Sequence, residues 1–377
     1  MKKKLLAVAV AGALAAPGLA MAQSSVTISG IFKASLENVR IGSPSAARNT
    51  AGTNNSETRV ADDSSRIVFN MTEDLGGGLS AIGQADIRLN MSSGVAGSTA
   101  ASGNTHVGLQ SKTLGRFIVG RQDLHYFNRE SDLTNLAGDL RADSISLISS
   151  AGGGTQAIAV TSRTAQVMHY TSPNFGGFTM TAAYATNGPN NTQADTTSVG
   201  RKGNTVYLNP NFKGSNFQVG WSYYRGKNDG GGVTLATGDQ KSNKLYGSFN
   251  MAGFKVGLAW DKSTITATTG ALGDISERTA WSFPVSYTMG NNQFHAHYTK
   301  ARDDRRTVAQ DGAKMFAMSY QYTMSKRTSV GLTYAKITND AGAAYNFFTG
   351  TSLGNSAFAA TAGEDPRMLA ATLRHAF

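Results

Sequence analysis

The sequence predicts an all-β fold, a 16-stranded antiparallel β-barrel that crosses a membrane with its strands. Sixteen segments alternate apolar and polar side chains, and each is roughly ten residues long, which is about the length that a tilted strand needs to cross a bilayer. The connections between these segments alternate between short and long. After residue 22, the sequence contains no apolar run of about 18 residues that could form a membrane-spanning helix.

The alternation begins in the first half of the chain. In segment 65–73, Ile67, Phe69 and Met71 share one face, whereas Arg66 and Asn70 share the other. Such a strand separates two environments, which in a membrane barrel are lipid outside and water inside. The strands expected in this half are 25–37, 65–73, 79–90, 104–111, 115–122, 163–171, 176–185 and 203–210.

The second half continues the pattern. In segment 215–225, Phe217, Val219 and Trp221 share one face, and Gln218 and Ser222 share the other. A soluble β-sandwich shows the same alternation with its apolar face inward, so periodicity alone leaves that fold open. The strands expected here are 215–225, 242–251, 253–262, 278–288, 292–302, 314–323, 327–338 and 368–377.

The lengths of the connections favour the barrel over the sandwich. Short turns such as EDLGGG (73–78) and SPNFGG (172–177) alternate with long loops. Outer-membrane barrels combine an even strand number with short periplasmic turns and long extracellular loops. Lipid also requires a closed sheet, because an open edge would leave backbone hydrogen bonds unmade. The expected long loops are 38–64, 91–103, 123–162, 186–202, 226–241, 263–277, 303–313 and 339–367.

The N-terminal segment 1–22 has the features of a secretory signal peptide. Three lysines precede an apolar run, Pro17 and Gly18 break that run, and Ala20-Met21-Ala22 forms a small-x-small cleavage site. The apolar run is too short and too interrupted for a membrane anchor. We therefore expect residues 1–22 to be removed on export and residues 23–377 to form the barrel.

Composition excludes several classes of site. The chain has no cysteine, which rules out disulfides, metal-thiolate sites and a cysteine nucleophile. Its formal charge is +11, which falls to +8 without Lys2, Lys3 and Lys4. A basic chain can bind nucleic acid, an anionic membrane surface or small anions. Export to the cell surface argues against nucleic acid as a partner.

Five stretches carry more specific information: SRIVFNMTEDLGGGLSAIGQAD (65–86), GRFIVGRQD (115–123), YTSPNFGGFTMTAAY (170–184), SKRT (325–328) and LRHAF (373–377). In this order, they resemble the 16-stranded trimeric porins of Gram-negative (proteobacterial) outer membranes. The resemblance implies a homotrimer of water-filled barrels in which the long third loop, 123–162, folds into the lumen. It also implies passive diffusion of small hydrophilic solutes, often with a preference for anions. Outer-membrane lipid, lipopolysaccharide and the barrel-assembly machinery are the other partners it implies.

The charge of the pore must be read residue by residue, because the chain departs from the family pattern. Lys33 stands where an acid is common, and Arg88 replaces a small residue. The resemblance places basic residues of the second and sixth strands at the constriction, so Arg66 and Arg163 are expected to set ion preference. The alternation of the strands places three further basic residues on the lumen face of this wall: Lys33, Arg88 and Arg116. For these three, a position away from the narrowest part of the pore is favoured.

Loop 123–162 is expected to face this basic wall with acids. These are Asp123, Glu130, Asp132, Asp139 and Asp143. The favoured function is a general diffusion porin with a mild anion preference. The alternative is a substrate-specific channel with a solute-binding site at loop 123–162. The loop offers only Tyr126 and Phe127 as aromatic residues, which favours general diffusion over a stacked sugar path.

An enzymatic function is not expected. The chain has six histidines, and the sequence shows no arrangement typical of a hydrolase site. His295 and His297 share one strand face and could bind a metal, but no third ligand is evident, so lumen histidines are the favoured interpretation. We expect no catalytic residue, no cofactor and no metal.

The last strand, 368–377, ends on Phe377. In a closed barrel this strand must pair with the first strand. Phe377 is expected to lie in the aromatic girdle at the periplasmic rim and to be needed for assembly.

Overall fold

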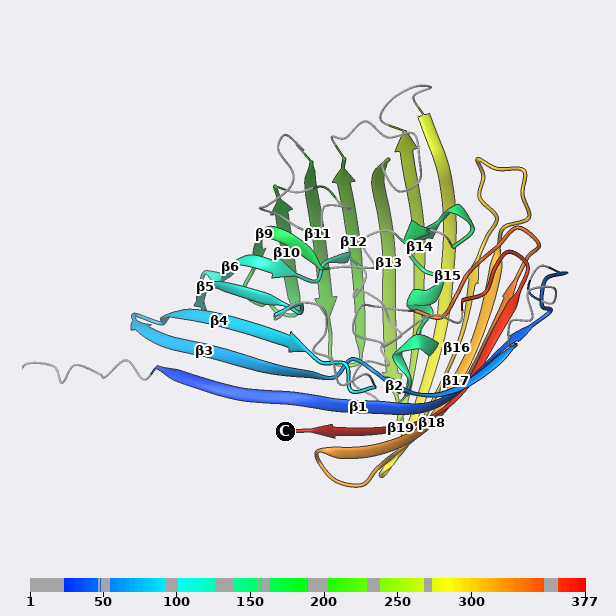
Figure 1. The fold of residues 1–377 in the computed structure, drawn as a ribbon. Coiled ribbons are helices and arrows are strands. Elements are labelled where there is room, and N and C mark those ends of the chain that lie inside the picture. The colour runs from blue at the N-terminus through cyan, green and yellow to red at the C-terminus, as the bar shows by residue number, and fades with distance from the viewer. Residues whose placement is uncertain are drawn as a thin grey trace, which may run out of the picture.

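The computed structural model describes residues 24–46, 48, 55–92, 101–125, 138–154, 156–157, 163–186, 188, 203–228, 238–267, 273–348 and 359–377. These residues form one large antiparallel sheet that curves until its two ends meet (Figure 1). The first strand, β1 (Ser25–Gly42), pairs with the last strand, β19 (Asp365–Ala376), so the sheet is closed. No helix among the described residues is long and apolar enough to span a membrane.

The strands between these two follow in chain order. The first group is β2 (Ser56–Asp62), β3 (Arg66–Gly76), β4 (Leu79–Arg88), β5 (Thr105–Ser111), β6 (Gly115–Gln122), β9 (Thr164–Thr171) and β10 (Phe178–Ala185). The second group is β11 (Asn204–Lys213), β12 (Phe217–Lys227), β13 (Asp239–Met251), β14 (Phe254–Ala267), β15 (Gly273–Met289), β16 (Asn292–Ala301), β17 (Ala313–Thr323) and β18 (Thr328–Asn339). Each barrel strand pairs with the next one along the chain, and β6 pairs with β9 across the third-loop insertion.

Strands β2 and β3 are two parts of one barrel strand. Both pair with β1: β3 lies against residues 25–31, and β2 lies against residues 34–40. The two parts are separated at residues 63–65, where Asp62 accepts hydrogen bonds from the backbone N–H groups of Ser64 and Ser65. The sheet therefore closes as a barrel of 16 strands, which confirms the predicted fold class.

Several strands extend beyond the predicted ends on the side of the long loops. The predicted strand 25–37 continues to Gly42, and the predicted loop 38–64 contains β2. In this extension the polarity is reversed, because Val39 and Ile41 point inward and are buried whereas Arg40 is exposed. A strand that has left the bilayer faces water on its outer side, so its apolar residues cover the interior instead. The same extension lengthens β14 and β15, which leaves only 268–272 of the predicted loop 263–277 between them.

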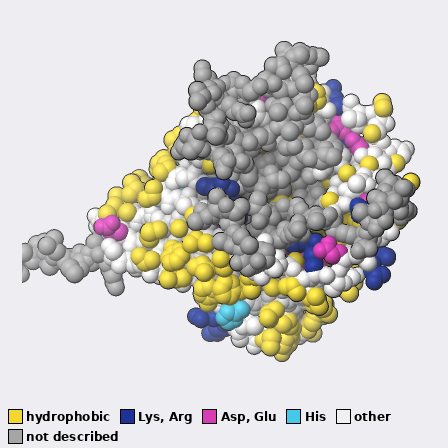
Figure 2. All heavy atoms as spheres, in the orientation of Figure 1, with side chains coloured by type: hydrophobic (Ala, Val, Ile, Leu, Met, Phe, Trp, Pro, Cys, Tyr) yellow, Lys and Arg dark blue, Asp and Glu magenta, His cyan; other side chains and the backbone are white. Residues whose placement is uncertain are grey.

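The outer surface carries an apolar belt. Val219, Leu245 and Leu258 lie on neighbouring strands and are each about half exposed. Figure 2 shows apolar side chains gathered at the left and bottom of this view. Such a belt matches a surface that contacts lipid acyl chains rather than water.

Phe377 completes the closure of the barrel. Its backbone N–H donates to the carbonyl of Gly30 over 3.1 Å, and its carbonyl accepts from the N–H of Gly30 over 3.0 Å. Its ring lies 5.2 Å from that of Phe32. A Cβ at position 30 would approach the Phe377 ring to 2.5 Å, so glycine provides the space for this ring. The predicted pairing of the first and last strands is confirmed.

The third loop folds into the barrel, as the resemblance implied. Its described parts include the short helices η2 (Leu140–Ala142), η3 (Ser144–Ser146) and η4 (Gly152–Gly154) and the two-residue strands β7 (Ser150–Ala151) and β8 (Gln156–Ala157). Figure 1 shows the short helices on the concave side of the sheet. Leu147 and Ile148 are buried in a core with inward-facing apolar residues of β17 to β19, among them Met315, Ile337 and Met368.

A second segment, 340–348, follows β18 and contacts the third loop. The N–H of Ala344 donates to the carbonyl of Gly153 over 2.8 Å, and the N–H of Phe348 donates to Ser146 Oγ over 3.0 Å. The buried ring of Tyr345 lies where a Cβ on Gly154 would be. Gly154 has a φ of +88°, which glycine adopts without strain.

Candidate pore constriction

The third loop is attached to one side of the barrel by what we call the β1-side anchor, formed by Lys33, Glu37, Arg59, Asp63 and Arg141. Glu37 of β1 accepts from Arg59 Nε over 2.9 Å and from Arg141 Nη1 of the loop over 3.1 Å. Lys33 Nζ lies 2.8 Å from Asp63 Oδ2. The other oxygen of Asp63 accepts the N–H of Leu140 in the loop over 3.0 Å.

Lys33 is therefore a buried residue and does not line the open pore as a solvent-exposed base. Its side chain is 1% exposed, and its charge is matched by Asp63. A buried ion pair of this kind fixes geometry, since removing one partner would leave the other charge uncompensated in the interior. In the structure, Lys33 contributes to holding the third loop.

A second group, the β14-side anchor, attaches the loop to the opposite wall and consists of His125, Ser149, Ser242, Lys244 and Asp261. Asp261 Oδ1 accepts the N–H of Ser149 over 3.1 Å, and Asp261 Oδ2 accepts from Ser149 Oγ over 3.1 Å and from Ser242 Oγ over 2.6 Å. His125 Nε2 lies 2.8 Å from Ser242 Oγ, and Lys244 Nζ donates to the carbonyl of His125. Burial, together with the nearby charge of Lys244, lowers the pKa of His125 to about 4, which keeps the ring neutral at physiological pH.

The acids predicted to face the pore divide into three groups. Asp139 and Asp143 are fully buried, and each caps a short helix by accepting a backbone N–H two residues ahead, from Arg141 and Ile145. Asp123 Oδ1 lies 3.1 Å from Arg163 Nε. Glu130 and Asp132 lie outside the described residues, as do Tyr126 and Phe127.

The predicted basic residues lie on one wall, and most of them have partners. Arg88 Nη2 lies 2.7 Å from Asp86, and Arg88 Nη1 donates to Ser64 over 2.8 Å. Arg116 Nη2 contacts His106 Nε2 at 2.6 Å. The charges of Arg163 and Arg66 both act on Arg88, so the structure brings these three residues together.

Arg66 differs from the other members of this wall. It is opposite Arg88 in the β3–β4 ladder, and it has no acidic partner among the described residues. Arg374 of β19 shares this property and lies within the electrostatic reach of Arg66. We did not predict Arg374 as a site residue, although the alternation in 368–377 places it on the lumen face and was the available signal.

His295 and His297 lie side by side with ring centroids 6.1 Å apart. Both ring nitrogens of His297 have protein partners, Thr299 Oγ1 at 3.0 Å and the carbonyl of Ala142 at 2.7 Å. No group of three potential metal ligands occurs within the part of the chain that the structure describes. His297 is therefore a further contact between the wall and the third loop.

Comparison with known proteins identifies the family. Residues 7–342 match the family described as Gram-negative porin. The chain belongs to this family. Among curated relatives, the porin is 26% identical over 372 residues to the major outer membrane protein P.IB of Neisseria lactamica, which covers 94% of this chain and 98% of that protein.

Solved structures show the same fold. An anion-selective porin from Comamonas acidovorans superposes with a TM-score of 0.73 at 21% identity, covering 94% of this chain and 100% of the other. The trimer form of OmpT from Vibrio cholerae superposes with a TM-score of 0.64 at 11% identity, covering 94% and 99%. The porin is thus an outer-membrane channel for passive diffusion.

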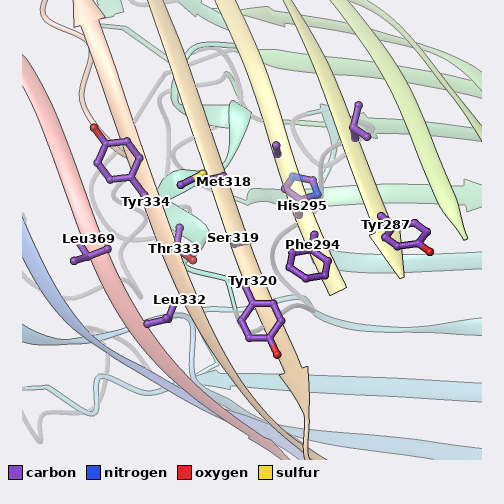
Figure 3. A pocket seen from close by; sticks show the side chains of 12 residues that line it. Tyr287, Phe294, His295, Met318, Ser319, Tyr320, Leu332, Thr333, Tyr334 and Leu369 are labelled. Carbon is purple, nitrogen blue, oxygen red and sulfur yellow. The ribbon is translucent and has the colours of Figure 1, made fainter. Parts of the chain in front are cut away.

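An apolar groove lies on the outer surface of the porin and does not belong to this constriction. A groove of about 480 Å³ follows β15 to β19 and is lined by outward-facing residues such as Phe294, Met318 and Leu332 (Figure 3). Its position on the apolar belt assigns it to the lipid-facing surface. Solutes in the lumen have no access to it through the closed sheet.

Proposed function

We propose that this porin is a general diffusion channel with a mild preference for anions. The observation that carries the proposal is an imbalance of unpaired charge among the described residues of the lumen wall. Arg66 and Arg374 have no acidic partner among the described residues, whereas Asp123, Asp139 and Asp143 are engaged in an ion pair or in helix caps. A net positive wall concentrates anions and repels cations in a narrow aqueous pore.

The paired residues contribute less to this field. Arg163 and Asp123 form a near-neutral pair, as do Arg88 and Asp86, and a close pair of opposite charges has a field that decays faster than that of a single charge. Of the predicted determinants, Arg66 is therefore expected to dominate, and Arg163 is expected to act partly by neutralising Asp123. The similarity to an anion-selective porin agrees with this direction.

Two further properties belong to the same proposal. The porin assembles as a homotrimer, which the trimeric form of a structural neighbour supports. Residues 1–22, outside the described residues, act as a signal peptide that is cleaved before assembly. The favoured general channel has no catalytic activity. The described part of the third loop supports it over a substrate-specific site, because its charged side chains are engaged in the two anchors, in helix caps or in the ion pair of Asp123 with Arg163.

The zero-current potential in a potassium chloride gradient tests the preference. Purified trimer in a planar bilayer should give the sign that corresponds to anion selectivity, and Arg66→Glu with Arg163→Glu should shift the potential toward cation selectivity. Two opposing charges in such a pore lie within a Debye length of a permeating ion, about 8 Å at physiological salt. The shift should therefore shrink in molar salt. A wild-type channel that prefers cations at low salt would refute the proposal.

A further inference from the structure

Three lumen-facing donors lie on β18, β19 and β3, with β1 between β19 and β3. Arg374 Nε and Ser329 Oγ are buried and have no hydrogen-bond partner among the described residues. Ser329 and Arg374 are directly opposite each other in the β18–β19 ladder. Arg66 has no acidic partner in the described part of the chain, and its charge acts on Arg374.

The strand register places these donors around one spot. Arg374 is opposite Lys33 in β1, and Arg66 is opposite Ile31, which is two residues along the same strand. Residues two apart on a strand point to the same face and are separated by about 7 Å. Two long arginine side chains that start from either side of β1 can therefore reach a common ligand above it.

The neighbouring charges do not neutralise this spot. Lys33 is matched by Asp63 at 2.8 Å, and Arg88 is matched by Asp86 at 2.7 Å. Among the described residues, Arg66 and Arg374 therefore remain as two positive charges whose mutual repulsion is unfavourable unless an anion lies between them. The guanidinium group also presents parallel N–H donors that fit two oxygens of a phosphate or carboxylate, which chloride cannot match.

We propose that Arg66, Arg374 and Ser329 form a subsite in the pore for a divalent oxyanion, for which inorganic phosphate is the simplest probe. The inference rests on the proposed anion preference and deepens it, because it distinguishes oxyanions from halides. Two guanidinium groups balance the two charges of hydrogen phosphate, and the serine hydroxyl supplies a further donor to a third oxygen. A bound oxyanion occupies the path and slows the passage of chloride.

The test is inhibition of chloride current by phosphate in single trimers, at constant ionic strength and at pH 8, where phosphate is mostly divalent. Wild-type current should fall with phosphate in a saturable manner. Arg374→Gln should raise the concentration for half-inhibition about tenfold, because one charge-assisted bidentate contact is lost. Arg374→Lys should restore the chloride conductance while leaving phosphate inhibition weak, because lysine acts as a point charge.

The matched control is Arg367→Gln. Arg367 belongs to the same strand but is exposed on the outer face, so this variant removes the same charge without affecting the lumen. It should retain wild-type inhibition. Arg66→Gln lies on another strand and repeats the test if Arg374→Gln fails to assemble.

Two outcomes separate this inference from the proposed function. A wild-type channel that prefers chloride over potassium but shows no saturable inhibition by phosphate overturns the subsite alone. Equal inhibition of the wild type, Arg374→Gln and Arg66→Gln also overturns it. A wild-type channel without anion preference overturns the proposed function, which the salt gradient measures independently.

Discussion

Substitution of Asp261 by asparagine should release the third loop from one wall of the barrel. Asp261 is buried, and its two oxygens accept hydrogen bonds from Ser149 of the loop and from Ser242 and Ser263 of the wall. The amide of asparagine would turn an NH₂ group toward these donors. The substitution would also remove a negative charge that interacts with the nearby buried Lys244.

The magnitude follows from these contacts. A hydrogen bond to a charged group contributes about 1.5–3 kcal/mol, and Asp261 accepts several such bonds. Because the contacts share one carboxylate, their losses are not additive, and we expect about 3–5 kcal/mol for the whole anchor. Each 1.4 kcal/mol changes a population tenfold, so detachment of the loop from β14 should become at least roughly a hundredfold more frequent.

Single-channel recording measures this effect directly. Detachment of a loop inside the lumen changes the current, so Asp261→Asn should show frequent brief current steps in a bilayer at constant voltage. Asp274→Asn is the matched control, since Asp274 accepts from Thr266 and Arg306 at a partly exposed position and has no hydrogen bond to the described part of the third loop. An Asp261→Asn trimer whose current is as steady as that of Asp274→Asn would show that the anchor does not hold the loop.

Further expectations concern pH, membrane-facing parity and closure. The pKa of His125 in the folded protein, about 4, lies below the ordinary value of 6.5. The stability that the neutral ring contributes is therefore fully present above pH 6.5, and about 3 kcal/mol of it is lost as the pH falls toward 4. Current steps should therefore increase at pH 4.5, and His125→Gln should abolish that pH dependence; a wild-type trace unchanged at pH 4.5 would contradict it. Val219→Arg should lower the free energy of unfolding by about 2–4 kcal/mol, measured by urea unfolding from lipid vesicles, whereas Gln218→Arg, on the lumen face, should lower it far less. Equal losses would contradict the assignment of Val219 to the lipid face of β12. Deletion of Phe377 removes both backbone bonds to Gly30 and should lower the yield of heat-resistant trimer, and an undiminished yield would argue against its role in closure.

The barrel itself could be predicted from sequence because lipid imposes a simple rule on each strand. Where strands rise above the bilayer, that rule reverses, and inward-facing residues such as Val39, Ile41 and Ile265 become apolar. Because the prediction assumed that apolar residues always face outward, it ended these strands at the edge of the bilayer, before their actual ends. The rule also fails at Met315 and Ile337, whose lumen face is apolar because the third loop covers it.

The charges of the constriction were harder to predict than its walls. Parity predicted that Arg66, Arg88 and Arg116 face the interior, but it could not show which of the basic residues have acidic partners. The pairing of Lys33 with Asp63 depends on the break between β2 and β3, and the role of Arg141 depends on the path of a loop about a hundred residues away from Glu37. Such contacts are set by tertiary structure and leave no periodic signal in the sequence.

The contact of segment 340–348 with the third loop has a consequence for biogenesis. Ala344 and Phe348 bond to Gly153 and Ser146, so parts of the chain that are about 190 residues apart must meet before the loop is fully held. Contacts between such distant segments form late, because the intervening chain must be ordered first. We therefore expect the ring of strands to close around a wide, unobstructed hole, and the narrow aperture to mature only after the last hairpin is in place. The newly inserted protein would then form a transient wide-pore intermediate, through which the outer membrane briefly admits solutes that the finished pore excludes.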